Sequence, residues 1–123
     1  MSKENYIAEI IKEFPSLKAG KENDENWANE GFKFLSNKNY EQAEIKFKML
    51  TRSQPNHQDG FEGLAYLYYE TGDYKKAVWF MKKAVKIARE FLKNNSIDLE
   101  VIEEMESNLK SMETKKTIKR WWE

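Results

Sequence analysis

The sequence predicts an all-α protein in which two helical hairpins stack side by side, with one further helix at each end. Three observations support this fold class. A pattern of large, small and aromatic residues at positions 27–50 returns 34 positions later, at 61–84. Within each copy the apolar residues recur at spacings of three and four, as in amphipathic helices. The chain also contains only two prolines and five glycines, which is typical of a helical protein.

The first predicted helix lies near the N-terminus and ends at Pro15. Proline stops a helix because it lacks the backbone N–H and clashes with the preceding turn. The apolar face of this helix consists of Tyr6, Ile7, Ile10, Ile11 and Phe14. The polar stretch 16–26 is predicted to be a linker. We therefore assign residues 1–23 to an N-terminal helix and linker.

The first hairpin is predicted from two apolar stripes separated by a short turn. The residues at helical spacing are Trp27, Gly31 and Phe34 in its first helix and Tyr40, Ala43, Phe47 and Leu50 in its second. The polar run 36–39 between them is too short for anything but an antiparallel connection. Gly31 and Ala43 are the small residues expected where the two helices come closest.

The second hairpin repeats this arrangement. Its equivalent residues are Phe61, Leu64, Ala65, Tyr68, Tyr74, Ala77 and Met81. No helix breaker occurs before Asn94 and Asn95, so its second helix is expected to run from about residue 73 to residue 93. The residues expected on the inner face of that helix are Tyr74, Ala77, Val78, Met81, Val85, Ala88 and Leu92. The two hairpins together occupy residues 24–93.

Residues 94–123 are predicted to form a capping helix followed by a basic and aromatic tail. Ser96 can cap the start of this helix, where Asp98 and Glu100 suit the positive end of the helix dipole. Its apolar stripe is Leu99, Ile102, Met105, Leu109 and Met112. The last hairpin of a stack leaves an apolar face bare, and a helix that is apolar on one side covers that face.

The period of 34 and the order of these residues resemble the tetratricopeptide repeat, a helix–turn–helix unit that stacks into an α-solenoid. The resemblance covers two copies between residues 24 and 89. First helices in this family line a concave groove that holds a peptide or helix of a partner protein. The resemblance thus implies a non-enzymatic interaction module, an adaptor or chaperone-like protein. It places these residues in or around the groove: Glu25, Phe32, Leu35, Asp59, Glu62, Tyr66, Tyr69 and Glu70.

An aromatic and acidic groove favours a partner segment that carries lysine or arginine beside an apolar anchor. The alternative is that the N-terminal helix folds over this stripe and fills it through Ile7, Ile10 and Phe14. Some members of the family clamp the C-terminal carboxylates of chaperones with lysine and asparagine. The matching positions here are Ala28, Phe32 and Gly63, so that specificity is not expected.

The alternative function is a self-assembling scaffold that uses exposed tryptophans. Trp79 stands where the family generally has a polar residue, so it marks a protein contact unless the terminal helix covers it. Trp121 and Trp122 end a tail rich in lysine and arginine and are candidates for a homodimer contact. Nucleic-acid or membrane binding by this tail is not expected, because its cations are few and the rest of the chain has no basic face.

Composition and motifs argue against catalysis and bound cofactors. The chain has 21 basic and 21 acidic side chains, no cysteine and a single histidine, His57, which is expected in a solvated turn. It contains no glycine-rich phosphate loop and no metal-ligand spacing, so no catalytic residue, metal or cofactor is predicted. It also shows no leader pattern and no apolar run of membrane-spanning length. We therefore expect a cytoplasmic protein.

Overall fold

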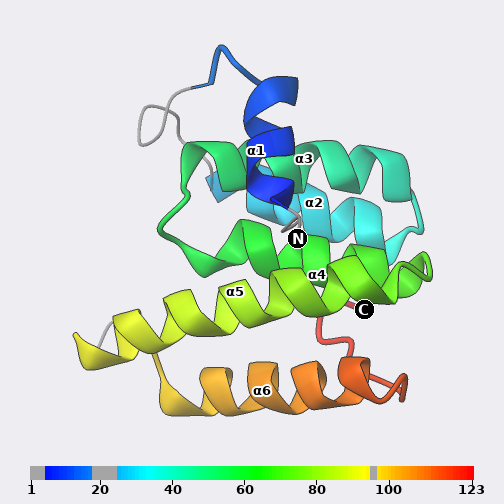
Figure 1. Ribbon diagram of the computed structural model, residues 1–123. Helices are drawn as coiled ribbons and strands as arrows, with labels where there is room; N and C mark the ends of the chain where they lie inside the picture. Colours follow the sequence, from blue (N-terminus) through cyan, green and yellow to red (C-terminus); the bar gives the residue numbers. More distant parts are fainter. Residues whose placement is uncertain (1–4, 18–24, 95–96) are drawn as a thin grey trace.

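The computed structural model describes residues 5–17, 25–94 and 97–123, and these form an all-α helical stack, as predicted (Figure 1). Within the described residues there are six helices and no strand. The helices are α1 (Tyr6–Glu13), α2 (Glu25–Ser36), α3 (Tyr40–Ser53), α4 (Gln58–Glu70), α5 (Tyr74–Lys93) and α6 (Leu99–Glu113). Most of the predicted linker, residues 18–24, and the predicted capping serine, Ser96, lie outside the described residues.

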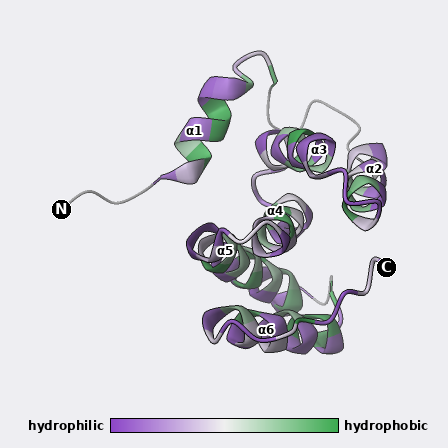
Figure 2. Ribbon diagram, turned by 90° about the vertical axis from the view of Figure 1, so that its right-hand side faces the viewer, coloured by the Kyte–Doolittle hydropathy of each residue, from purple (hydrophilic) through white to green (hydrophobic). Residues whose placement is uncertain are grey.

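Helices α2 to α6 pack on one another in chain order. The pairs α2–α3 and α4–α5 are the two predicted hairpins, α3 packs against α4 to join them, and α6 packs against α5. Figure 2 shows the stack nearly end-on, with α2 and α4 on one side and α3 and α5 on the other. Helix α1 lies on the α3 and α5 side, and the C-terminal end of the chain lies on the α2 and α4 side.

The two hairpins are joined through one aromatic ring that fits between two glycines. Phe47 of α3 is fully buried. A Cβ atom added to Gly31 of α2 would lie 2.5 Å from the Cε1 atom of Phe47, and one added to Gly63 of α4 would lie 2.3 Å from it. Both helices therefore approach the ring too closely for any side chain. The prediction for Gly31 is confirmed, whereas the repeat pattern gives no indication of Gly63.

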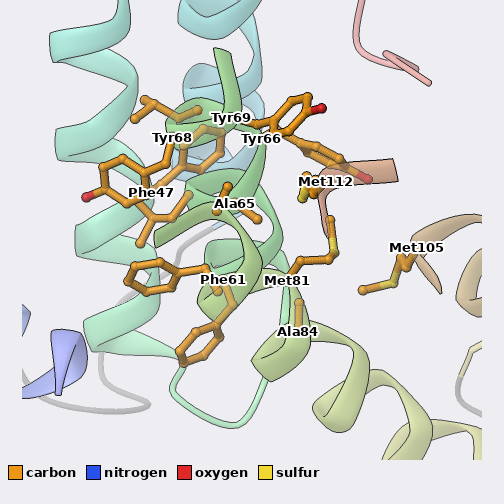
Figure 3. Close-up of a cluster of buried hydrophobic side chains, with 14 of the residues drawn as sticks. Phe47, Phe61, Ala65, Tyr66, Tyr68, Tyr69, Met81, Ala84, Met105 and Met112 are labelled. Carbon is orange, nitrogen blue, oxygen red and sulfur yellow. The ribbon is translucent and has the colours of Figure 1, made fainter. Parts of the chain in front are cut away.

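The core runs between the helices and is rich in aromatic side chains and methionine (Figure 3). Its fully buried members include Phe47, Phe61, Leu64, Tyr66, Phe80, Met81, Ile102 and Met105. Phe80 was not expected on the inner face of α5, yet it is 1 % exposed, because its ring also meets Tyr6 of α1. Tyr74 was expected there, but it is the first residue of α5 and remains 38 % exposed.

Helix α1 docks on the outer side of the stack instead of filling the predicted groove. Its Tyr6 ring stacks on Phe80 at 5.8 Å and meets the ring of Trp79 edge-on at 5.2 Å. Its Glu13 forms an ion pair with Lys48 of α3 at 2.9 Å. Trp79 is therefore partly covered by α1, a helix that was not expected to cover it.

Helix α6 covers α5, as predicted for a capping helix. Ile102, Met105 and Met112 are buried, while Leu99 at the start of the predicted stripe is exposed. Asp98 occupies the N-cap position without accepting a side-chain hydrogen bond. One polar residue, Asn108, is 3 % exposed on the inner face of α6. None of the described helices combines the length and apolarity needed to cross a membrane.

Candidate functional site

The C-terminal tail, which we define as residues 114–123, folds back along the side of the stack on which α2 and α4 lie (Figures 1 and 2). Lys115 reverses the chain after α6 with a φ of 56°, a left-handed conformation that glycine usually adopts at this position. The N–H of Lys116 then donates to the carbonyl of Ser111 at 2.8 Å, which closes the end of the helix. This turn directs the tail back toward α4.

The tail lies in a groove, which we call the tail groove, with walls from three helices. Its residues are Phe32 of α2, Tyr66, Tyr69 and Glu70 of α4, and Asn108 and Ser111 of α6. These side chains come from segments up to 79 positions apart, since 111 − 32 = 79. The stacking of α2 on α4, and of α6 on α5, is what brings them together.

Aromatic contacts fix the end of the tail. The Trp121 ring lies 4.5 Å from that of Phe32, and the Trp122 ring lies 4.4 Å from that of Tyr66. Contacts at these distances contribute about 0.5–1.5 kcal/mol each beyond the area they bury. Ile118 is 4 % exposed and belongs to the buried core. The tail is therefore an integral part of the packed structure.

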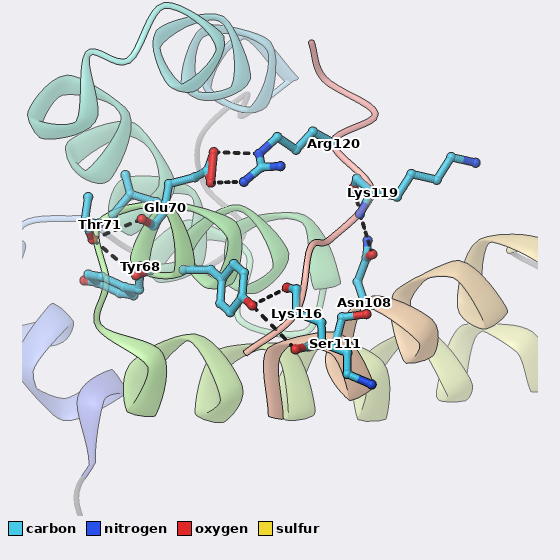
Figure 4. A network of polar contacts seen from close by, with 10 residues as sticks. Tyr68, Glu70, Thr71, Asn108, Ser111, Lys116, Lys119 and Arg120 are labelled. Atoms are coloured by element: carbon cyan, nitrogen blue, oxygen red, sulfur yellow. Dashed lines mark hydrogen bonds and ion pairs between the residues drawn. The ribbon is translucent and has the colours of Figure 1, made fainter. Parts of the chain in front are cut away.

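Polar side chains bind the backbone of the tail (Figure 4). The Oδ1 atom of Asn108 accepts a hydrogen bond from the N–H of Lys119 at 2.9 Å, and its Nδ2 atom donates to the Lys119 carbonyl at 3.3 Å. The Tyr69 hydroxyl donates to the carbonyl of Lys116. Because these bonds involve only main-chain atoms of the tail, they do not depend on the identity of its side chains.

An ion pair anchors the tail to the end of α4. The Nε atom of Arg120 donates to Oε1 of Glu70 at 2.8 Å, and its Nη2 atom donates to Oε2 at 2.6 Å (Figure 4). This two-point geometry matches the planar guanidinium to the planar carboxylate. The Glu70 side chain is only 16 % exposed, so water screens this pair less than an ordinary surface pair. Lys119 pairs with Glu104 at 3.4 Å but is 71 % exposed.

A buried carboxyl group continues the polar contacts beneath the tail. The Tyr66 hydroxyl donates to Oε2 of Glu62 at 2.8 Å and accepts a hydrogen bond from Asn108 at 3.1 Å. Burial raises the pKa of Glu62 from 4.5 to about 7; hydrogen bonds from Tyr66 and Trp121 lower it, while the charges of Asp59 and Glu104 raise it. Burial also raises the pKa of the Tyr66 phenol, which stays neutral. Glu62 is therefore part protonated near neutral pH.

A cavity of about 320 Å³ opens beside the tail groove between the start of α4 and helix α6. Its lining residues are Gln58, Asp59, Glu62, Val101, Glu104, Met105 and Trp121. Trp121 lines this cavity and is 47 % exposed. It is consequently less buried than Trp122.

Most residues that the resemblance assigned to a groove do lie together. Phe32, Tyr66, Tyr69 and Glu70 contact the tail, and Glu62 is buried and accepts a hydrogen bond from Tyr66. Leu35, Tyr66 and Tyr69 belong to the buried core instead of an open surface. Asp59 lies at the neighbouring cavity, and Glu25 begins α2 but its side chain lies outside the described part of the chain.

The two alternatives weighed for this groove, an open surface and a site filled by the N-terminal helix, both differ from the structure. The occupant is the tail, whose Trp121 and Trp122 pack within their own chain. The tail also supplies what an acidic and aromatic groove is expected to hold, namely an arginine beside apolar anchors. Lys115 and Lys116 remain exposed.

Four residues of this site were not predicted: Asn108, Ser111, Ile118 and Arg120. One signal for Asn108 was available, because it lies three positions after Met105 and four before Met112, where the stripe of α6 calls for an apolar residue. A polar residue on an inner face needs a partner. No comparable periodic signal exists in the tail.

The other titratable side chains of the described residues do not form a metal site. Within the described residues, no three His, Cys, Asp or Glu side chains gather in a way that could hold a metal ion. His57 caps α4 by accepting a hydrogen bond from the N–H of Asp59 at 3.3 Å.

Comparison with known proteins finds no matching family model, no similar curated protein and no similar solved structure.

Proposed function

We propose that this chain is a non-enzymatic protein–protein interaction module, an adaptor or chaperone-like protein of the tetratricopeptide type, that binds an extended segment of a partner protein in the tail groove. The observation that supports the proposal most directly is that the groove already holds a peptide segment without regular secondary structure. That peptide is the chain's own tail, and it is held by backbone hydrogen bonds, an ion pair and ring contacts. None of these contacts requires the peptide to be covalently attached.

The tail then acts as an internal competitor of the partner. A segment joined to its own groove by a short connection has an effective concentration in the millimolar range. A partner segment with the same intrinsic affinity would have to approach that concentration to displace it. The protein binds partners efficiently only when the tail is loosened or when the partner makes contacts beyond the groove. We place this activity in the cytoplasm, because a chain without cysteine is compatible with a reducing compartment.

The experiment uses the full-length chain with its tail weakened by Arg120→Ala and Trp122→Ala, which we call the released-tail variant. A fluorescently labelled peptide with the sequence of residues 114–123 is added, and its binding is measured by fluorescence anisotropy. We expect the peptide to bind the released-tail variant at least about tenfold more tightly than the wild-type chain, whose tail competes. A peptide with the same residues in scrambled order is the control.

The proposal fails if the peptide does not bind the released-tail variant at millimolar concentration while circular dichroism shows that the helices are intact. Equal binding of the native and scrambled peptides would also contradict it, because the groove would then bind peptides nonspecifically.

A second candidate function is self-assembly by exchange of tails between two copies. The connection between α6 and Ile118 is short, and its Lys115 adopts a left-handed conformation that is unfavourable for a residue with a side chain. Extending this connection into a second copy would relieve that conformation, and short hinges favour such exchange. Sedimentation of the wild-type chain from 1 µM to about 500 µM, where exchange begins to compete with internal docking, tests it. A dimer that Trp122→Ala abolishes would favour the scaffold.

A further inference from the structure

We infer that the tail groove selects partner segments with a defined order of residues: an apolar residue, then any residue, then arginine, then two aromatic residues. This order corresponds to positions 118–122 of the tail. The inference rests on the proposed function and specifies which partner segment the groove accepts. It is drawn from how each position of the docked tail meets the groove.

The apolar position is defined by Ile118. This side chain is 4 % exposed and packs into the same core cluster as Tyr69 and Met112. Its neighbours Thr117 and Lys119 are exposed. A segment in this register therefore needs a buried aliphatic residue at this point, with freedom on both sides of it.

The unrestricted position is that of Lys119. Asn108 binds both its N–H and its carbonyl, which every residue except proline possesses. The Lys119 side chain reaches only Glu104, in an exposed pair. The groove thus fixes the position of the backbone here without selecting a side chain.

The arginine position is the most selective one. Glu70 receives two parallel hydrogen bonds from Arg120, and its side chain is mostly buried. A lysine ammonium is a single point of charge and cannot form this two-point contact. A glutamate at this position would bring two carboxylates together. We therefore expect the groove to bind a segment with arginine at this position most tightly, one with lysine less tightly, and one with glutamate not at all.

The two aromatic positions differ in stringency. Trp122 lies on Tyr66 and is partly buried, whereas Trp121 lies on Phe32 and is 47 % exposed beside the cavity. Removal of the ring at the position of Trp122 should therefore weaken peptide binding more than removal of the ring at the position of Trp121.

The test compares variants of the labelled peptide on the released-tail variant of the full-length chain. We expect about tenfold weaker binding than that of the native peptide when lysine replaces the arginine equivalent to Arg120, and likewise when alanine replaces the tryptophan equivalent to Trp122. Replacement of the arginine by glutamate should abolish measurable binding. Replacement of the residue equivalent to Lys119 by alanine should change binding less than about threefold.

Exchanging the charges of Glu70 and of the peptide arginine tests the ion pair most directly. Adding Glu70→Arg to the released-tail variant should abolish binding of the native peptide and create binding of the peptide that has glutamate in place of arginine. Glu90→Arg is the matched control, since Glu90 is exposed near the C-terminal end of α5, where it pairs with Lys93 at 3.3 Å. This control should bind the native peptide as before.

The outcomes separate this inference from the proposed function. If the native peptide binds and its substitutions all bind equally well, the selective order is wrong while the groove function stands. If no peptide binds the folded released-tail variant, both are wrong. Sedimentation of the wild-type chain as a tail-dependent dimer at micromolar concentration would assign the segment to a second copy and overturn the inference of a separate partner.

Discussion

Arg120 and Glu70 are separated by 50 positions in sequence, yet their side chains form a two-point ion pair at the mouth of the tail groove. The pair joins the end of α4 to a segment with no regular secondary structure. It is accompanied by a backbone clamp at Asn108 and by ring contacts on either side. These contacts act together, so weakening one of them should loosen the tail as a whole.

Glu70→Gln should loosen the tail because it removes the charge that Arg120 meets. We expect the free energy of unfolding to fall by about 1–2 kcal/mol. Acrylamide quenching of Trp121 and Trp122, measured with Trp27 and Trp79 replaced by phenylalanine, should increase. Lys119→Ala removes an exposed pair and should change stability by less than about 0.5 kcal/mol. Similar effects of both substitutions would contradict the importance assigned to the Arg120 pair.

Asn108→Leu should release the tail even though it completes the apolar stripe of α6. Leucine cannot bind the N–H and carbonyl of Lys119, and it removes the hydrogen bond that Asn108 donates to the Tyr66 hydroxyl. Unmet buried hydrogen bonds cost about 1–3 kcal/mol. Amide hydrogen exchange at Lys119 reports the change directly, and we expect faster exchange in the variant. Unchanged protection there would show that Asn108 does not hold the tail.

Gly63→Ala should destabilise the protein although alanine favours helix. The added Cβ atom would lie 2.3 Å from the Phe47 ring, and overpacking of this kind costs about 1–3 kcal/mol. The gain in helix propensity is about 1 kcal/mol. Urea unfolding of the single variants and of Gly63→Ala with Phe47→Leu measures the coupling between them. A stabilised Gly63→Ala protein would show that the two hairpins are not tightly joined at this ring.

Stability should fall as the pH rises from about 4.5 to about 7, because of Glu62. Its pKa is raised to about 7 in the folded protein, so the folded chain retains a proton that the unfolded chain has already lost in this range. The full effect on the free energy of unfolding is on the order of 3 kcal/mol. This stabilisation is present below the pKa of the unfolded chain, 4.5, and is lost above the pKa of the folded chain, about 7. Urea unfolding at pH 5 and pH 8 measures it.

Glu62→Gln is the control for this pH dependence. Glutamine has a similar shape and cannot ionise, so the variant should lose most of the difference between pH 5 and pH 8. An unchanged difference in the variant would assign the pH dependence to other groups.

The sequence predicted the helices well because their signals are local. The stripes around Phe47 and Ala77, and the polar turns between them, fix where each helix lies within a residue or two. The contact of Gly31 with Phe47 follows from the hairpin geometry. Phe80 did not follow, because α5 packs against several neighbours at once and therefore buries more than one stripe.

The occupant of the groove could not be predicted for a different reason. The tail has no periodic pattern, and its position depends on contacts between distant residues such as Tyr69 and Lys116. The resemblance placed Phe32, Tyr66 and Glu70 on one surface, and in the structure all three contact the tail. It could not identify which segment would cover them, because several segments of this chain have an apolar side.

The setting of Phe47 between Gly31 and Gly63 has a consequence for molecular recognition. The ring also touches Phe32, which forms a wall of the tail groove, at 4.9 Å. The position of that wall thus depends on a side chain of α3 that lies between α2 and α4. A shorter residue at position 47 would let α2 shift relative to α4, and under the proposed function it would weaken the selection among peptides without changing any residue that lines the groove.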